Sequence, residues 1–157
     1  MAHLMREMLD KIRLSDEDRL YILGDMIDRG PDPAGVIELV AGKKNITALR
    51  GNHEDCFAEW YENVEDKIEN RYFYNTYDVL TGSAETMVKI TRYVGWMKRL
   101  PLYKKLKTPD ACYLLAHAST AGILQFWKRS KDGFIWDSSM VDRKRGIPGY
   151  ISIVGHV

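Results

Sequence analysis

The sequence LYILGDMIDRG, residues 20–30, joins an apolar, strand-like run to a loop of carboxylates, an arginine and glycines. A buried strand that stops at Leu23 would present Asp25, Asp28 and Arg29 together at the end of a sheet. Carboxylates bind metal ions, and an arginine contacts an oxyanion through two parallel hydrogen bonds. The loop is therefore suited to hold a cation next to a phosphate.

Three more strand-like runs end in the same way. Residues 46–49 (ITAL) lead into RGNHE at 50–54, residues 112–116 (CYLLA) lead into His117, and residues 150–154 (YISIV) lead into Gly155 and His156. Ligands of open α/β sheets bind beyond the carboxyl ends of the strands. Four endings of this kind predict one shared site rather than four unrelated turn residues.

The pattern between these endings predicts alternating helices and strands. Asp32 followed by Pro33 predicts a helix N-cap and first turn, and Gly42 ends that helix. Strand, helix and strand across residues 20–49 predict a right-handed βαβ unit with parallel strands. Apolar spacing predicts further helices at 2–12, after GNHE, from Ser83 to Leu100 and at 121–128, and further strands at 102–107, 112–116 and 150–154. Residues 62–82 are expected to form an insertion or lid near the site, and residues 130–149 a loop.

Length and composition bound the class of protein. A chain of 157 residues suggests a single domain, 1–157, and the 45% hydrophobic and 29% charged fractions are ordinary for a soluble globular protein. The formal net charge of +1 gives no reason to expect nucleic-acid binding, and no long uncharged apolar run predicts a membrane span. The two cysteines, Cys56 and Cys112, lie in different motif regions and do not suggest a disulfide framework, so a reducing, cytoplasmic location is expected.

GDMIDRG, RGNHE, a strand ending in His-Ala and a final strand ending in Gly-His resemble the calcineurin-like metallophosphoesterases. Within that family, GD-x-x-DRG together with GNHE is similar to the bacterial serine/threonine phosphoprotein phosphatases. The resemblance implies an α/β fold, a sandwich whose central mixed β-sheet is flanked by helices. It also implies hydrolysis of phosphomonoesters at a dinuclear metal site, with a phosphorylated small molecule or a phosphoprotein as the substrate.

The resemblance assigns metal ligands to four positions. Asp25 would bridge two divalent ions, and Asn52, His117 and His156 would complete the second ion's ligands. Manganese is expected, and iron or zinc would also suit these mixed oxygen and nitrogen ligands.

The resemblance also assigns the catalytic residues His53, Asp28 and Arg29. His53 would be the general acid that protonates the leaving oxygen, and Asp28 would orient it. Arg29 would bind the phosphate, with Asn52 and His53 beside it. The family usually supplies another phosphate-binding arginine, for which Arg143 and Arg145 are candidates.

The sequence departs from the family at both ends. The opening GD-x-H-G motif, whose Asp and His bind the first metal, has no match, and the chain stops at Gly-His-Val. The fold is therefore expected to be incomplete at both ends and the first metal site to keep only Asp25. Two explanations stay open: a fragment of a longer protein, or a chain that has lost catalysis and binds phosphate or a partner. Symmetrical dinucleoside tetraphosphate hydrolysis is an alternative activity, although Glu54 after Asn-His favours the phosphatase branch.

Overall fold

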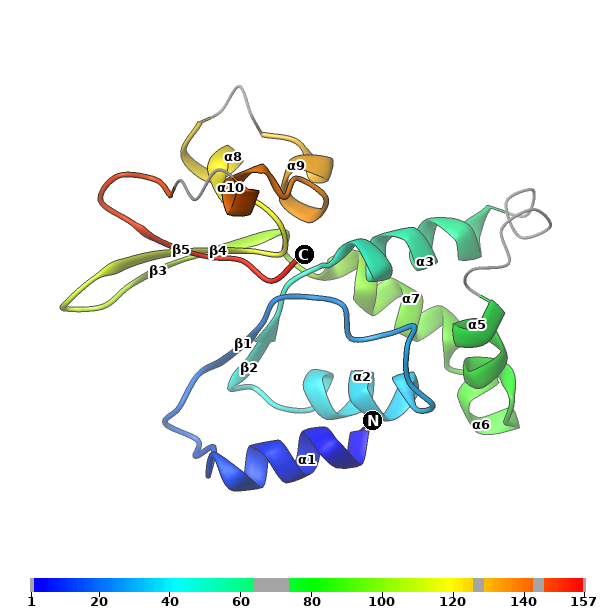
Figure 1. The fold of residues 1–157 in the computed structure, drawn as a ribbon. Helices are drawn as coiled ribbons and strands as arrows, with labels where there is room; N and C mark the ends of the chain where they lie inside the picture. Colours follow the sequence, from blue (N-terminus) through cyan, green and yellow to red (C-terminus); the bar gives the residue numbers. More distant parts are fainter. Residues whose placement is uncertain (1, 64–73, 126–128, 143–145, 157) are drawn as a thin grey trace.

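The computed structural model describes residues 2–63, 74–125, 129–142 and 146–156, and the fold alternates helices with short strands (Figure 1). The first half contains α1 (Ala2–Lys11), β1 (Leu20–Ile22), α2 (Pro33–Ala41), β2 (Ile46–Ala48) and α3 (Asn52–Glu62). The middle contains α5 (Tyr74–Thr81), α6 (Ala84–Met87), α7 (Ile90–Arg99), β3 (Tyr103–Lys107) and β4 (Cys112–Ala116). The last part contains α8 (Ala121–Leu124), α9 (Lys131–Ile135), α10 (Ser139–Asp142) and β5 (Ile151–Ile153).

The described strands form two small sheets. β1 and β2 pair in parallel, as the strand–helix–strand pattern predicts. β4 lies between β3, with which it pairs antiparallel, and β5, with which it pairs in parallel. Helices α1 and α2 lie beside the first sheet, and α8, α9 and α10 lie to one side of the second (Figure 1). The expected α/β class with mixed strands and flanking helices is confirmed.

Helix α2 begins and ends where its sequence signals place it. The Asp32 side chain accepts a hydrogen bond from the Gly35 backbone N–H at 2.8 Å, and Pro33 occupies the first turn. A proline fits there because its missing N–H would have no partner within the helix. Gly42 is the C-cap residue, as predicted.

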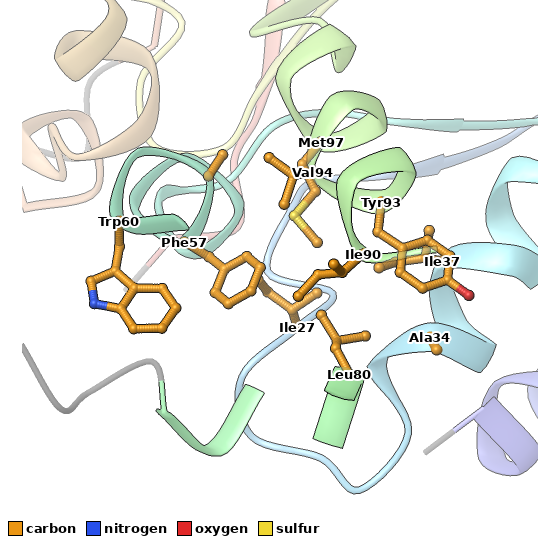
Figure 2. Close-up of a cluster of buried hydrophobic side chains, with 11 residues drawn as sticks. Ile27, Ala34, Ile37, Phe57, Trp60, Leu80, Ile90, Tyr93, Val94 and Met97 are labelled. Carbon is orange, nitrogen blue, oxygen red and sulfur yellow. The ribbon is translucent and has the colours of Figure 1, made fainter. Parts of the chain in front are cut away.

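A core cluster joins α2, α3, α5 and α7 to the loop that follows β1 (Figure 2). Its buried members are Ile27, Ala34, Ile37, Phe57, Ala58, Trp60, Leu80, Ile90, Tyr93, Val94 and Met97. Ile27 lies inside the GDMIDRG sequence and is only 6% exposed. The charged loop is therefore anchored in the core by its own apolar residue.

The prediction of one helix from Ser83 to Leu100 is wrong. The chain forms α6 and α7 with a turn between them at residues 88–89. Met87, whose spacing continues the apolar pattern of α7, is 58% exposed. Buried apolar spacing begins only at Ile90, whereas Lys89 pairs with Glu38 and Glu85 at the surface.

The prediction of a loop over residues 130–149 is also wrong, because α9 and α10 lie within it. The Ser130 side chain accepts a hydrogen bond from the Gly133 N–H at 2.9 Å and so caps α9. Phe134 and Ile135 of this short helix are buried in a cluster with Leu114 of β4. Burial against β4 thus stabilises a helix that is too short to give a periodic signal.

Only part of the expected insertion or lid, residues 62–82, is described. Residues 64–73 lie outside the described residues, and α5 occupies 74–81. Leu80 of α5 is fully buried in the cluster of Figure 2. Whether the segment acts as a lid stays a prediction.

None of the helices among the described residues combines the length and the apolar character needed to cross a lipid bilayer.

Candidate metal centre and its neighbours

The loop after β1 makes an unusually tight path. Gly24, Asp25 and Asp28 have φ angles of 94°, 58° and 87°. These angles lie in the left-handed region, which residues other than glycine seldom adopt. A Cβ at Gly24 would lie 2.5 Å from the backbone nitrogen of Gly51, so a glycine is required there. This contact brings the loop after β1 against the loop after β2.

The Glu54 carboxylate holds these two loops together. Its oxygens accept hydrogen bonds from the backbone N–H groups of Asp25 at 2.9 Å, Met26 at 2.6 Å and Gly51 at 2.9 Å. The side chain is fully buried, and this burial raises its pKa while the N–H donors partly counteract the rise. By binding the backbone of Asp25, Glu54 sets the direction in which the Asp25 side chain extends from the loop.

Four predicted metal ligands converge just beyond the carboxyl ends of β1, β2, β4 and β5. The Nε2 atom of His117 lies 2.8 Å from Oδ1 of Asn52, 3.1 Å from Nδ1 of His156 and 3.5 Å from Oδ1 of Asp25. Atoms of Asp25, His117 and His156 that can bind a metal all lie within 4.8 Å of one another. The structure therefore brings together the residues that the four strand endings predict.

The hydrogen bonds of His117 suit a cation at this point. Its Nδ1 lies 2.5 Å from the carbonyl oxygen of Leu23, which can only accept, so Nδ1 carries the proton. In the neutral ring, the Nε2 lone pair then faces oxygens of Asn52 and Asp25, which also present lone pairs. A cation placed between these atoms would be attracted by the lone pairs of all of them. Histidines that bind metals typically donate their other N–H to a carbonyl or carboxylate, as His117 does.

His156 is also disposed to be a neutral ligand. Burial lowers its pKa, and the neighbouring His117 lowers it further. The unprotonated imidazole is the form that binds a metal ion. The donor set of one carboxylate, one amide and two imidazoles fits manganese, iron or zinc.

His53 lies next to this cluster and is paired with Asp28. Its Nδ1 is 2.9 Å from Oδ2 of Asp28, whose side chain is only 5% exposed. Its Nε2 is 3.9 Å from Oδ2 of Asp25, and its backbone N–H donates to Oδ1 of Asp25 at 3.3 Å. One ring nitrogen is thus held by a carboxylate while the other faces the metal ligands.

Arg29 lies on the wall of a cavity that Asp25 and Asp28 also line. The arginine is exposed, and the cavity, of about 460 Å³, lies between α1, the loop after β1 and the start of α2. The other walls of the cavity are mainly apolar. Arg143 and Arg145, the candidates for another phosphate-binding arginine, lie outside the described residues.

Two residues of this region were missed by the sequence reasoning. Glu54 was noted only as part of GNHE, although a glutamate at the third position of a helix is a known signal for a bond back to the N-cap N–H. Thr76 of α5 donates a hydrogen bond to Oδ1 of Asp28 at 3.2 Å, and no motif marks it in the sequence.

Comparison with known proteins identifies relatives across most of the chain. The sequence profile of the family "Calcineurin-like phosphoesterase" matches residues 2–146. The chain is 27% identical over 133 residues to the serine/threonine-protein phosphatase 1 of Salmonella typhimurium, covering 83% of this chain and 60% of that protein. It is 30% identical over 125 residues to a symmetrical bis(5'-nucleosyl)-tetraphosphatase of Paracidovorax citrulli, covering 78% of this chain and 41% of that protein.

A solved structure shares the fold. The crystal structure of a hypothetical protein from Pyrococcus horikoshii OT3 superposes with a TM-score of 0.52 at 21% identity, covering 75% of this chain and 48% of that one. The chain therefore spans about half of that structure, and 60% or less of the length of the two curated relatives.

Proposed function

Because the chain belongs to the calcineurin-like phosphoesterase family, we propose that it hydrolyses phosphate monoesters with the help of divalent metal ions, and that its substrates are phosphoserine or phosphothreonine side chains of proteins. The observation that carries this proposal is the convergence of Asp25, Asn52, His117 and His156 next to the His53–Asp28 pair. The phosphatase relative from Salmonella typhimurium supports the choice of substrate.

Asp25, Asn52, His117 and His156 would hold a metal ion, with manganese proposed as the ion. A divalent ion there would supply positive charge to neutralise the phosphoryl oxygens and to acidify a water molecule. A dinuclear centre, in which Asp25 is shared with a second ion, is part of the proposal. Among the described residues, only one group of three or more histidine and acidic side chains could hold an ion, so the second ion's other ligands stay open.

His53 is proposed as the general acid. Asp28 orients the ring through Nδ1, and the other ring nitrogen, Nε2, faces Asp25. A phosphate ester bound next to Asp25 would place its leaving oxygen within reach of Nε2, which can donate the proton that an alkoxide needs. Arg29 is proposed to bind the phosphate from the adjoining cavity, where its guanidinium can form two parallel hydrogen bonds.

The test is hydrolysis of a phosphothreonine peptide and of an aryl phosphate in the presence of Mn²⁺, with His53→Ala and His3→Ala compared. His3 lies on the exposed surface of α1, which makes it a matched control. We expect His53→Ala to lower kcat by about 100-fold or more and His3→Ala to leave it unchanged. If neither substrate is hydrolysed in a metal-dependent way, the proposal is overturned and a phosphate- or partner-binding role is favoured.

A second candidate is symmetrical hydrolysis of dinucleoside tetraphosphates. One relative with that name, from Wigglesworthia glossinidia brevipalpis, is 32% identical over 128 residues, and this chain covers 42% of that protein. Comparing kcat/KM for the phosphothreonine peptide and for a diadenosine tetraphosphate would separate the two activities. A higher value for the tetraphosphate would replace the phosphatase assignment.

A further inference from the structure

Thr76 joins the His53–Asp28 pair from a different part of the chain. Its hydroxyl donates to Oδ1 of Asp28 at 3.2 Å, while Oδ2 of the same carboxylate lies 2.9 Å from Nδ1 of His53. The hydroxyl is the donor of this bond, and the Asp28 oxygen is the acceptor. The two oxygens of Asp28 are thus engaged by two different side chains, which restricts rotation of the carboxylate.

The helix that carries Thr76 is fixed against both partners. Leu80, one turn further along α5, is fully buried in the core cluster that also contains Ile27, the residue before Asp28. Tyr77 packs edge-on against Trp60 of α3, with ring centroids 5.7 Å apart, and His53 lies in the first turn of α3. Thr76 itself is 1% exposed. Its position is therefore set by packing of α5 against the Asp28 loop and against α3, which carries His53.

We propose that Thr76 is a positioning residue, which orients the general acid His53 by holding the Asp28 carboxylate in one rotamer. The inference rests on the proposed function, because it concerns the proton that His53 donates. Asp28 is only 8% exposed, so the Thr76 hydroxyl meets its carboxylate inside the protein. Loss of the Thr76 hydroxyl would leave Oδ1 without this donor and allow the carboxylate to turn away from Nδ1.

The effect of such a loss depends on the leaving group of the ester. A phenolate needs a proton from the general acid, whereas a dinitrophenolate leaves without one. We therefore compare Thr76→Val, which removes the hydroxyl but keeps the shape, with Thr76→Ser, which keeps the hydroxyl. Thr81→Val is the matched control, because its hydroxyl is bonded to the Tyr77 carbonyl within the same helix and does not contact Asp28.

The measurement is kcat with Mn²⁺ for phenyl phosphate and for 2,4-dinitrophenyl phosphate. We expect Thr76→Val to lower kcat about tenfold or more for phenyl phosphate and less than about threefold for the dinitrophenyl ester. Thr76→Ser and Thr81→Val are expected to stay close to the wild type. Equal losses on both esters, no loss on either, or failure of Thr76→Ser to restore kcat would overturn the inference.

A second readout separates this inference from the proposed function. In the metal-free chain at fixed pH, the His53 Nδ1–H proton is expected to give an NMR signal protected from exchange with water. The signal is assigned by its loss in His53→Ala, and it is expected to broaden in Thr76→Val but not in Thr76→Ser. An unchanged signal in Thr76→Val would reject the positioning role even if the chain hydrolyses phosphate esters. A broadened signal in a chain without hydrolysis would show that Thr76 orients the His53 ring and would reject the proposed function.

Discussion

At the scale of single residues, the site depends on a few side chains and backbone angles that hold two loops together. Asp25 and Asp28, which follow Gly24, both have left-handed φ angles although they are not glycines. Strained backbone of this kind persists only where the surrounding structure imposes it, and it is concentrated at functional sites. Here the Glu54 carboxylate and the buried Ile27 side chain impose it.

Gly24→Ala tests the close approach of the two loops. A methyl group at this position would meet the backbone of Gly51 at 2.5 Å, and the φ of 94° adds strain. We expect the free energy of unfolding to fall by at least about 2 kcal/mol, as measured by urea denaturation. Gly146→Ala is the control, because a Cβ there meets nothing within 4 Å. Equal stability of the two variants would contradict the packing described here.

Glu54→Gln tests the buried carboxylate. The change replaces one acceptor oxygen with an N–H donor, which would face backbone N–H groups that are themselves donors. We expect a loss of about 3 kcal/mol in the free energy of unfolding together with weaker Mn²⁺ binding, because Asp25 loses its support. Urea denaturation and a Mn²⁺ titration measure the two effects, with the exposed Glu7→Gln as the control. A loss below about 0.5 kcal/mol would show that the three hydrogen bonds contribute little.

The sequence revealed the residues of the site better than it revealed what supports them. Asp25, His117 and His156 could be predicted to meet because each lies within two positions of the end of an apolar run, and the carboxyl ends of strands share one edge. Thr76 could not be predicted, because its only signal is a hydrogen bond to a residue 48 positions away. Unlike the three site residues, Thr76 follows no strand ending and belongs to no motif, so only the folded chain reveals its contact with Asp28.

At the scale of elements, α2 is tied to α7 by a small network around Glu38. Its carboxylate accepts hydrogen bonds from the Tyr93 hydroxyl at 2.7 Å and from Lys89 at 3.0 Å. Both hydrogen bonds lower the pKa of Glu38, and the bond from Tyr93 has the larger effect. The pKa of Tyr93 is raised to about 12, mainly by burial and to a smaller extent by the hydrogen bond to Glu38.

Tyr93→Phe removes the hydroxyl and keeps the buried ring. We expect the free energy of unfolding to fall by about 1 kcal/mol at pH 7, measured by urea denaturation beside the surface control Tyr150→Phe. Because the pKa of Glu38 is lowered in the folded chain, its contribution is present above the ordinary value of 4.5 and disappears as the pH falls through the lowered value. Tyr93 has a raised pKa, so its contribution disappears as the pH rises from 10 to about 12. A Tyr93→Phe variant as stable as the wild type at pH 7 would contradict this network.

The elements themselves were predictable where a local signal exists. Asp32, Pro33 and Gly42 marked both ends of α2, and the strand at Cys112–Ala116 matches its predicted bounds. The break between α6 and α7 was missed because Met87 continues the apolar spacing although it faces solvent. Helix α9 was missed because its five residues are stabilised by burial against β4 rather than by periodicity.

At the scale of the whole molecule, the proposed metal site lies where the two sheets meet. His117 follows β4 and contacts the Leu23 carbonyl oxygen after β1, while its own carbonyl accepts hydrogen bonds from Gly155 and His156 at 2.8 Å each. A second link is ionic, since Lys131 of α9 pairs with Asp55 of α3 at 2.6 Å. The side chains proposed to bind metal thus come from segments of both sheets.

An ion bound at this junction should therefore stabilise the entire chain. At a Mn²⁺ concentration 100 times the dissociation constant, a ligand that binds only the folded state adds about 2.7 kcal/mol. For a chain of this length, that corresponds to a rise in Tm of roughly 5–10 °C, measured by calorimetry. Excess EDTA should reverse the rise, and Asn52→Ala should reduce it. A Tm that does not respond to Mn²⁺ would argue against an ion linking the two sheets.

The most direct test of the account is the binding of Mn²⁺, followed by electron paramagnetic resonance in the wild type, His117→Ala and His3→Ala. His117 is the central contact of the proposed ligands, and His3 is a histidine of α1 on the exposed surface. We predict saturable binding to the wild type and to His3→Ala, and binding at least about tenfold weaker to His117→Ala. Equal binding to all three chains, or binding to none, would contradict the claim that these strand ends form a metal centre.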